Sequence, residues 1–313
     1  MTHTAPTTIK IAGYQPPASV HTRGVEVFCK ALTERLGDRV RIEFEPNIVQ
    51  AGFNAQDLLA RVEDGRLDMC YFSASYLADR VPEFALLDLP FMYANREQAY
   101  EVLDGPLKTV LKDKLAANTG YRLIDFWDNG FRHFSNAVRP IQTPEDCKGL
   151  KIRTLFSDLH CEVFRALGFE PKPLDVKELI SGIESGDVTA QENPLTNTYN
   201  FGIHHHHRYI TLSAHFFGAA ALLCNANAYA AWTDDVQAAV EAAAAIATVS
   251  QRQFAANEDA DMMAKFAQED VEIATLSPDQ LARFVEAVQP VIDTQKDIFG
   301  EPLFSLASPS TPS

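Results

Sequence analysis

The sequence is short of the features that mark several large classes of protein. Positive charge is scarce, since 27 Lys and Arg residues stand against 42 Asp and Glu residues and give a formal net charge of −15. This balance argues against nucleic acid or an anionic membrane as the main partner. No apolar run approaches the roughly 18–20 residues that a membrane span needs. With 46% hydrophobic and 22% charged residues, the composition is typical of a globular protein with room for two lobes.

Cysteine is sparse and shows no metal-binding spacing. The five cysteines include no Cys-x-x-Cys pair, which argues against a structural zinc site. Their odd number leaves at least one free thiol. We interpret most of them as small buried hydrophobic residues rather than as nucleophiles or disulfide partners.

The motifs of the common enzyme classes are also missing. The chain has no Gly-x-Ser-x-Gly elbow, no Gly-x-Gly-x-x-Gly after a strand, no Gly-Lys-Ser/Thr phosphate loop and no His-Glu-x-x-His. We therefore predict no cofactor and no catalytic residue. The run His204–His207 is expected to form an exposed loop, because alternate residues of a strand would give two metal ligands at best and no local carboxylate completes a site. Adventitious nickel or zinc binding is expected there, and no functional metal.

The hydrophobic pattern predicts an α/β fold. The first segments read strand, helix, strand, helix, strand, which favours a mainly parallel sheet covered on both faces. Asp128-Asn129-Gly130 is a turn signal, where we place the first crossing between lobes. From Asp234 to about Gln268 the pattern is helical, either as two helices that meet near residues 257–261 or as one helix that lies along both lobes.

Two short segments carry the best candidates for ligand binding. Arg153 ends the segment Gly-Leu-Lys-Ile-Arg, and Asn193 lies in Gln-Glu-Asn-Pro, each near the end of a predicted strand, where open α/β folds bind ligands. A planar cationic fork beside a group that both donates and accepts suits a small carboxylate. Arg132 is either a second cation for the ligand or a structural ion-pair arginine. Trp127 and Phe169 either line a pocket or belong to the core.

These segments, with others, resemble the substrate-binding proteins of tripartite ATP-independent periplasmic (TRAP) transporters, the DctP-like family. The resemblance extends from Ile9 to about Gly300 and rests on several motifs taken together. They are Gly-Phe-Arg at 130–132, Thr-Pro-Glu-Asp-Cys-Lys-Gly-Leu-Lys-Ile-Arg at 143–153, Ala-Leu-Gly-Phe-Glu-Pro-Lys-Pro at 166–173, Lys-Glu-Leu-Ile at 177–180 and Gln-Glu-Asn-Pro at 191–194. Where the family commonly has Asp-Gly before Gln-Glu-Asn, this chain has Thr189-Ala190.

The resemblance implies a two-lobed, periplasmic-binding-protein-like fold that closes on a small organic acid, with a long helix spanning both lobes. The expected lobes are 8–130 with about 216–256, and 131–215 with about 257–303, followed by a disordered tail at 304–313. Arg153 would anchor the carboxylate and Asn193 would assist it. The remaining expected ligand-binding residues are Arg132, Tyr14, Gln15, His21, Ser73, Ser75, Trp127 and Phe169.

The implied function is that of a periplasmic receptor, active as a monomer, that delivers its ligand to the membrane subunits of a TRAP permease. The N-terminus carries no leader peptide, so the chain is either a mature form or a cytoplasmic protein. Two alternatives use the same pocket. One is an α/β enzyme acting on an organic acid with His21 or His133 as general base. The other is the extracellular partner of a two-component sensor.

Overall fold

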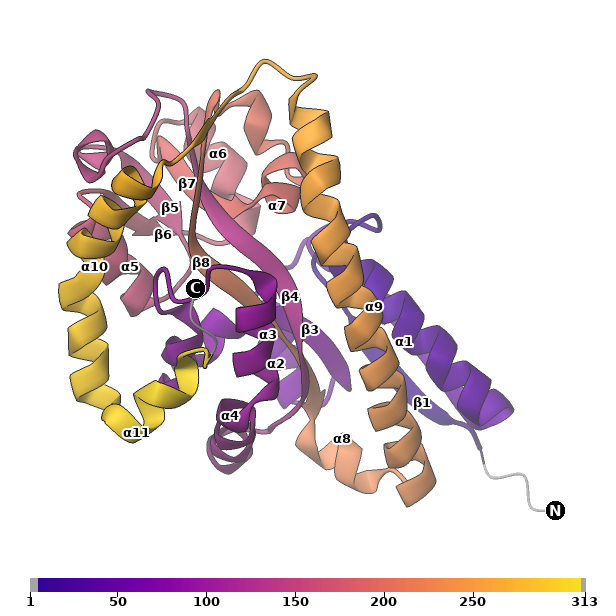
Figure 1. Cartoon of the computed structure of the whole chain (residues 1–313). Helices are drawn as coiled ribbons and strands as arrows, with labels where there is room; N and C mark the ends of the chain where they lie inside the picture. Colours follow the sequence, from indigo (N-terminus) through magenta and orange to yellow (C-terminus); the bar gives the residue numbers. More distant parts are fainter. Residues whose placement is uncertain (1–4, 311–313) are drawn as a thin grey trace. The chain divides into compact units, whose positions relative to one another are not determined.

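The computed structural model describes residues 5–310, and these form two compact units (Figure 1). The first unit takes the chain up to Ser73 together with Lys112–Asp128 and Ala219–Asn257. The second takes Ala74–Leu111, Asn129–Gly218 and the chain from Glu258 onward. Each unit mixes strands and helices, so the predicted α/β class is confirmed.

The first unit is built on a mixed sheet. Strand β1 pairs in parallel with β2 and β3, as the sequence predicts, while β3 pairs antiparallel with β8. The elements of this unit are β1 (Thr7–Ala12), α1 (Val20–Leu36), β2 (Val40–Glu45), α2 (Asp57–Glu63), β3 (Met69–Ser73), the end of α4 (Pro106–Asn118), the first half of β4 (Tyr121–Asn136), the second half of β8 (Tyr209–Asn225), α8 (Ala226–Ala231) and most of α9 (Asp234–Phe266).

Helix α1 shows how the sequence fixes the local structure of this unit. Its N-cap Ser19 accepts a hydrogen bond from the backbone N–H of Thr22, and its C-cap Gly37 has a φ of +54°. Val25, Phe28 and Leu32 recur at helical spacing and are buried in one cluster with Trp127 and the alanine-rich face of α9. Burial of such a stripe supplies most of a helix's stability.

The second unit holds the sequence motifs. In its sheet β7 lies between β4, to which it is antiparallel, and β5, to which it is parallel, and β5 also pairs with β6. This unit contains the start of α4, the second half of β4, the first half of β8 and the end of α9. Its other helices and strands are α3 (Arg96–Asp104), β5 (Lys151–Thr154), α5 (Asp158–Ala166), β6 (Glu170–Pro173), α6 (Leu179–Glu184), β7 (Ala190–Pro194), α7 (Leu195–Asn200), β9 (Glu272–Thr275), α10 (Pro278–Phe299) and α11 (Glu301–Phe304). Its 3₁₀ turns are η2 (Ala74–Leu77), η3 (Pro82–Asp88), η4 (Pro144–Cys147), η5 (Val176–Glu178), η6 (Ile203–His205) and η7 (Ser305–Ala307).

Helix α9 settles a question that the sequence left open, and strand β4 corrects one prediction. Helix α9 is one unbroken helix of 33 residues, with residues 234–257 in the first unit and the rest in the second (Figure 1). The turn predicted at Asp128-Asn129-Gly130 is wrong, because β4 continues through it, although the chain does pass from the first unit to the second there, after Asp128. Gly130 instead has a φ of +90°, and a Cβ there would lie 3.1 Å from Cβ of Pro194. The glycine thus permits a left-handed residue and a close approach within a strand.

Two stretches differ from the expected lobe boundaries. Residues 74–111 belong to the second unit, whereas the sequence prediction kept them with the first lobe. Residues 305–307 of the tail expected to be disordered form η7 instead, with Ala307 fully buried and its carbonyl accepting a hydrogen bond from Tyr93 Oη at 3.2 Å. Residues 311–313 of that tail lie outside the described part of the chain.

The cysteines are free thiols, as we interpreted them. Cys70, Cys147, Cys161 and Cys224 are buried and Cys29 is half-buried. Burial raises the pKa of the Cys29 thiol to about 12, and it raises those of the other four above their usual value. Over residues 5–310 no helix combines the length and the apolarity needed to cross a membrane.

Candidate ligand-binding site

Arg153 is the most unusual charged residue of the second unit. It lies in β5, beside Gln191 of β7, and is only 2% exposed. Its Nε donates to the carbonyl of Leu174 at 2.9 Å. Among residues 5–310 no carboxylate lies within ion-pair distance of it. Burial lowers the pKa of Arg153, although the guanidinium stays charged at any physiological pH.

Arg132 lies in β4 and is equally buried, but it has a partner. Its Nη2 donates to Oε1 of Glu192 at 2.9 Å and to the backbone carbonyl of Glu192 at 2.9 Å, and its Nε donates to Oε2. Burial alone would raise the pKa of Glu192, but the charge of Arg132 and the neighbouring His215 hold it well below its usual range. The geometry thus favours the structural ion pair among the two roles that the sequence left open for Arg132.

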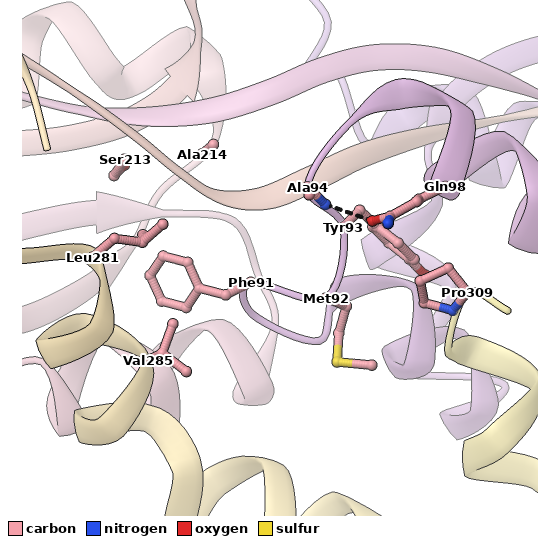
Figure 2. Close-up of a pocket in the computed structure, with 10 residues that line it drawn as sticks. All are labelled: Phe91, Met92, Tyr93, Ala94, Gln98, Ser213, Ala214, Leu281, Val285 and Pro309. Atoms are coloured by element: carbon pink, nitrogen blue, oxygen red, sulfur yellow. Dashed lines mark hydrogen bonds between the residues drawn. The ribbon is translucent and has the colours of Figure 1, made fainter. Parts of the chain in front are cut away.

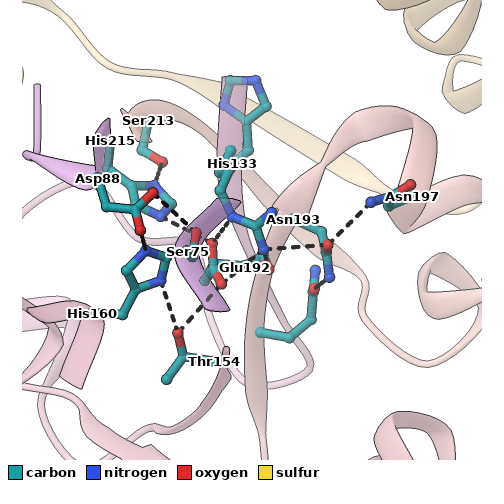
Figure 3. A network of polar contacts seen from close by, with 12 residues as sticks. Ser75, Asp88, His133, Thr154, His160, Glu192, Asn193, Asn197, Ser213 and His215 are labelled. Atoms are coloured by element: carbon teal, nitrogen blue, oxygen red, sulfur yellow. Dashed lines mark hydrogen bonds and ion pairs between the residues drawn. The ribbon is translucent and has the colours of Figure 1, made fainter. Parts of the chain in front are cut away.

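Asn193 connects this ion pair to a second row of polar groups. Its Oδ1 accepts from Arg132 Nη2 at 3.3 Å and from Asn197 Nδ2 at 3.4 Å, while its Nδ2 donates to Gln191 Oε1 at 2.6 Å (Figure 3). Gln191 Nε2 in turn donates to Ser135 Oγ at 2.6 Å. Asn193 is 4% exposed, and these bonds hold its amide in one orientation.

Several buried histidines surround Glu192. His215 Nε2 lies 3.5 Å from Glu192 Oε2, and Thr154 Oγ1 lies 3.4 Å from Oε1 (Figure 3). Thr154 also contacts His160 Nδ1 at 3.3 Å, and His160 Nε2 lies 3.3 Å from Asp88 Oδ2. Burial lowers the pKa of His215 to about 4, so its ring is neutral at pH 7.

Two expected ligand residues of the second unit have structural partners. Ser75 donates from Oγ to Asp88 Oδ1 at 3.0 Å and is 4% exposed. Phe169 is 3% exposed and packs against Phe134 and Phe164 at centroid distances of 5.3 and 5.9 Å. Phe169 therefore belongs to the hydrophobic core, which was the other interpretation of this aromatic residue.

The other expected ligand residues belong to the first unit. Gln15 is 1% exposed, and its Nε2 is buried without a hydrogen-bond partner among the described residues. His21 Nδ1 lies 3.3 Å from Gln251 Nε2, and the His21 ring stacks on Tyr71. The Tyr14 ring packs against the Phe72 ring at a centroid distance of 5.0 Å. Ser73 pairs with Ala220 between β3 and β8. Trp127 is fully buried, and its Nε1 donates to Thr248 Oγ1 at 3.1 Å.

His133, the other candidate general base, is poorly suited to that role. Burial, with the charges of His215, Arg96 and Arg132, lowers its pKa to about 3. Its Nδ1 accepts from the backbone N–H of Ala214 at 3.1 Å, so that nitrogen is already used within the fold. A base must be free to accept a proton near the working pH. His133 is better described as part of the backbone support of β8.

A cavity of about 460 Å³ lies in the second unit, and Ser213 and Ala214 on its wall contact His215 and His133 of the polar network. Its lining is largely apolar (Figure 2). Phe91 and Ala214 on its wall have φ values of +57° and +46°. The lining residues are Phe91, Met92, Tyr93, Ala94, Gln98, Ser213, Ala214, Leu281, Val285 and Pro309. None of them is an arginine or lysine, so the cavity offers no cation to an organic acid.

Glu192 lies within the Gln-Glu-Asn-Pro motif, but the sequence analysis predicted no role for its side chain. The signal was available in principle, because an acidic residue in a fully buried strand needs a cationic partner. His160, Asp88 and His215 carried no such signal, since they come from separate segments that only the fold brings together.

Comparison with known proteins places these features in a family context. Residues 11–297 match the family model DctP, described as bacterial extracellular solute-binding protein, family 7. The protein y4mM of Sinorhizobium fredii is 30% identical over 95% of this chain, which spans 54% of that protein's length.

Solved structures that resemble this chain are also solute-binding proteins. A TRAP periplasmic solute binding protein from Sulfurospirillum deleyianum with bound succinate is 29% identical, with a TM-score of 0.90 over 97% of this chain and 99% of that one. The sugar acid binding protein DctPAm from Advenella mimigardefordensis in complex with galactonate is 25% identical, with a TM-score of 0.91 over 96% and 98% of the chains. These relatives are solute-binding receptors, so the enzyme alternative is not supported.

Proposed function

Because the chain belongs to family 7 of the bacterial extracellular solute-binding proteins, we propose that it is a receptor that holds a small organic acid through Arg153. The observation that carries the proposal is the buried guanidinium of Arg153, which has no carboxylate partner among the described residues. A buried charge is costly unless it is paired. A ligand carboxylate would supply the missing charge.

The net charge of the protein sharpens this argument. At −15 the molecule repels anions on average, so a ligand acid must be held by a local cation. Arg132 is neutralised by Glu192, whereas Arg153 is not. We therefore propose one acidic group per ligand as the minimum that the site recognises, with Asn193, fixed by Arg132 and Gln191, as the neighbouring polar contact.

The ligand class follows from relatives that bind succinate or galactonate. Both molecules carry a carboxylate, which a two-pronged arginine contact recognises at about 1.5–3 kcal/mol per charge-assisted hydrogen bond. The proposal thus covers dicarboxylates and sugar acids, and it extends to delivery of the ligand, by a periplasmic monomer, to the membrane subunits of a TRAP permease. Gln15 is proposed as a further ligand contact, because its Nε2 lacks a partner among the described residues.

The test is a thermal-shift screen against organic acids that includes succinate and galactonate, followed by calorimetry on the best binder. A ligand at about 100 times its Kd stabilises the folded state by roughly 2.7 kcal/mol. Arg153→Ala should remove measurable binding while the circular dichroism spectrum and unfolding midpoint stay near those of the parent. An Arg153→Ala variant that binds the acid as tightly as the parent refutes the assignment. Recovery of the ligand chemically unchanged after long incubation distinguishes a receptor from an enzyme.

Delivery and oligomeric state need separate measurements. Light scattering on the purified protein should give the mass of a single chain. Uptake of the acid by vesicles that contain a TRAP permease should depend on added receptor. Binding without any effect on uptake would favour the sensor alternative.

A further inference from the structure

The histidine tract 204–207 is not the exposed loop that the sequence predicted, because His204 and His207 are buried and His204 and His205 belong to η6. The tract also has a partner that the sequence did not reveal. Within the described part of the chain, one group of three His, Cys, Asp or Glu side chains is placed to hold a metal ion: His204, His205 and Glu269. One potential ligand atom from each lies within 4.8 Å of the others. The sequence prediction of no metal rested on the lack of a nearby carboxylate, and the fold supplies one from the turn after α9.

His204 is held in place like a metal ligand. Its Nδ1 lies 3.4 Å from the carbonyl oxygen of Thr198, and its ring stacks on Tyr199 at 4.5 Å. When Nδ1 donates to a carbonyl, the lone pair of a neutral imidazole lies on Nε2, which is the arrangement that metal-binding histidines commonly have. Phe266 packs edge-on to the same ring at 5.7 Å. The ring is therefore fixed before any ion arrives.

Glu269 is the least satisfied acid of its turn. The neighbouring Asp270 lies 3.8 Å from Arg208, whereas Glu269 has no ion-pair partner among residues 5–310. Its backbone N–H donates to the carbonyl of Phe266 at 3.0 Å, which sets the turn that presents its side chain. A half-buried carboxylate close to two imidazoles and without a cation suits a positive ion.

We propose that His204, His205 and Glu269 form a binding site for a divalent transition-metal ion of the zinc class. Two imidazole nitrogens and one carboxylate oxygen are a common zinc donor set, with a water as fourth ligand. Ligand atoms about 2.1 Å from one tetrahedral ion lie about 3.4 Å apart, so a pair near the 4.8 Å limit would have to close. Rotation of the exposed His205 side chain can achieve this. Calcium and magnesium prefer all-oxygen sites and should not bind here.

The ion would join two segments of the second unit. His204 and His205 belong to η6, which follows α7 and the Asn193 motif, and Glu269 follows the C-terminal end of α9. A bound ion would hold η6 against this end of the helix. The inference does not depend on the proposed receptor function, because it concerns different residues and a different ligand.

The experiment is calorimetry with zinc chloride on protein purified without a polyhistidine tag and stripped of metal with EDTA. The parent should bind one zinc ion per chain, and its unfolding temperature should rise with zinc. Glu269→Gln, which keeps the shape of the side chain, and His205→Ala should each weaken binding at least tenfold. Magnesium or calcium chloride should give no heat of binding.

The matched control is His206→Ala, which removes a histidine of the same tract that lies outside the cluster. It should leave zinc affinity within about twofold of the parent, and circular dichroism should show each variant folded. Cobalt should give the visible bands of a four-coordinate site in the parent and in His206→Ala but not in Glu269→Gln. The proposal is overturned if zinc does not bind. It is also overturned if Glu269→Gln binds zinc like the parent while His206→Ala weakens binding as much as His205→Ala does. In that case the histidine tract alone would be a nonspecific ligand.

Discussion

Two buried arginines of the second unit, Arg132 and Arg153, differ in one respect. Both are 2% exposed and both lie in strands that pair with β7. Arg132 is held by the Glu192 carboxylate, whereas Arg153 has one hydrogen bond to a carbonyl and no carboxylate partner among the described residues. Burial alone therefore does not identify an arginine as a ligand contact. The charge balance around each buried cation separates the structural arginine from the binding one.

The largest effect expected from a single substitution is on the paired arginine. Glu192→Gln should destabilise the protein by about 3–5 kcal/mol, because it leaves the buried charge of Arg132 without its partner. Urea unfolding at pH 7 measures this. The double variant Arg132→Met with Glu192→Gln should recover part of the loss. A Glu192→Gln protein within about 1 kcal/mol of the parent would show that the pair is not what stabilises Arg132.

The unpaired arginine should respond in the opposite way. Arg153→Lys keeps the charge but loses the planar fork, so ligand affinity should fall by about 10–100-fold, or about 1.4–2.8 kcal/mol. Stability without ligand should stay within about 1 kcal/mol of the parent. Calorimetry and urea unfolding on the same preparation give both values. Arg132→Lys is the control, and it should lose more stability than Arg153→Lys does.

Acid should weaken the unit that contains both arginines. The pKa values of His215, His133 and His207 are lowered from 6.5 to about 4, 3 and 3, chiefly by burial. The unfolded chain therefore binds protons that the folded chain does not, and stability falls as pH drops below 6.5. Each histidine should cost about 2 kcal/mol between pH 7.5 and pH 5.

Urea unfolding at pH 7.5, 6.5 and 5.0 tests this pH dependence. His207→Gln should reduce the change in unfolding free energy between pH 7.5 and pH 5.0 by about the contribution of one histidine. If unfolding free energy is the same at pH 5.0 and 7.5, these rings do not stay neutral in the folded protein. Above about pH 7.5 the three should contribute almost no pH dependence, because the unfolded histidines are then also deprotonated.

The smallest expected effect concerns Gln15. Gln15→Leu removes a buried amide donor that has no partner among the described residues, so stability should be unchanged or higher by up to about 1 kcal/mol. Affinity for the organic acid should fall by about fivefold, or about 1 kcal/mol. Equal affinity in calorimetry would remove Gln15 from the proposed ligand contacts and leave Arg153 unaffected.

The sequence predicted much of the fold because hydrophobic period and capping residues are local. The strands and helices of the first unit through β3 follow from alternation and helical spacing, and Gly37 ends α1. The turn at 128–130 failed because Asn-Gly is a turn signal only where the chain reverses. Here Gly130 serves close packing inside β4. The order of residues cannot distinguish these two uses of glycine.

The site was predictable in part for the same reason. Arg153 and Asn193 lie within motifs, and both are buried polar residues near strand ends. The pairing of Arg132 with Glu192, the core position of Phe169 and the approach of Glu269 to His204 depend on strand register and on contacts between distant segments. Such contacts are set by tertiary packing, which a single sequence does not specify.

The free cysteines have a practical consequence for how this protein can be studied. Cys29, Cys70 and Cys224 lie in the first unit, and Cys147 and Cys161 lie in the second. Buried thiols with raised pKa values react slowly with alkylating reagents until the surrounding structure opens. Pulse alkylation in mild denaturant, followed by peptide mass spectrometry, would therefore report the opening of each unit separately, using reporters that the natural sequence already contains.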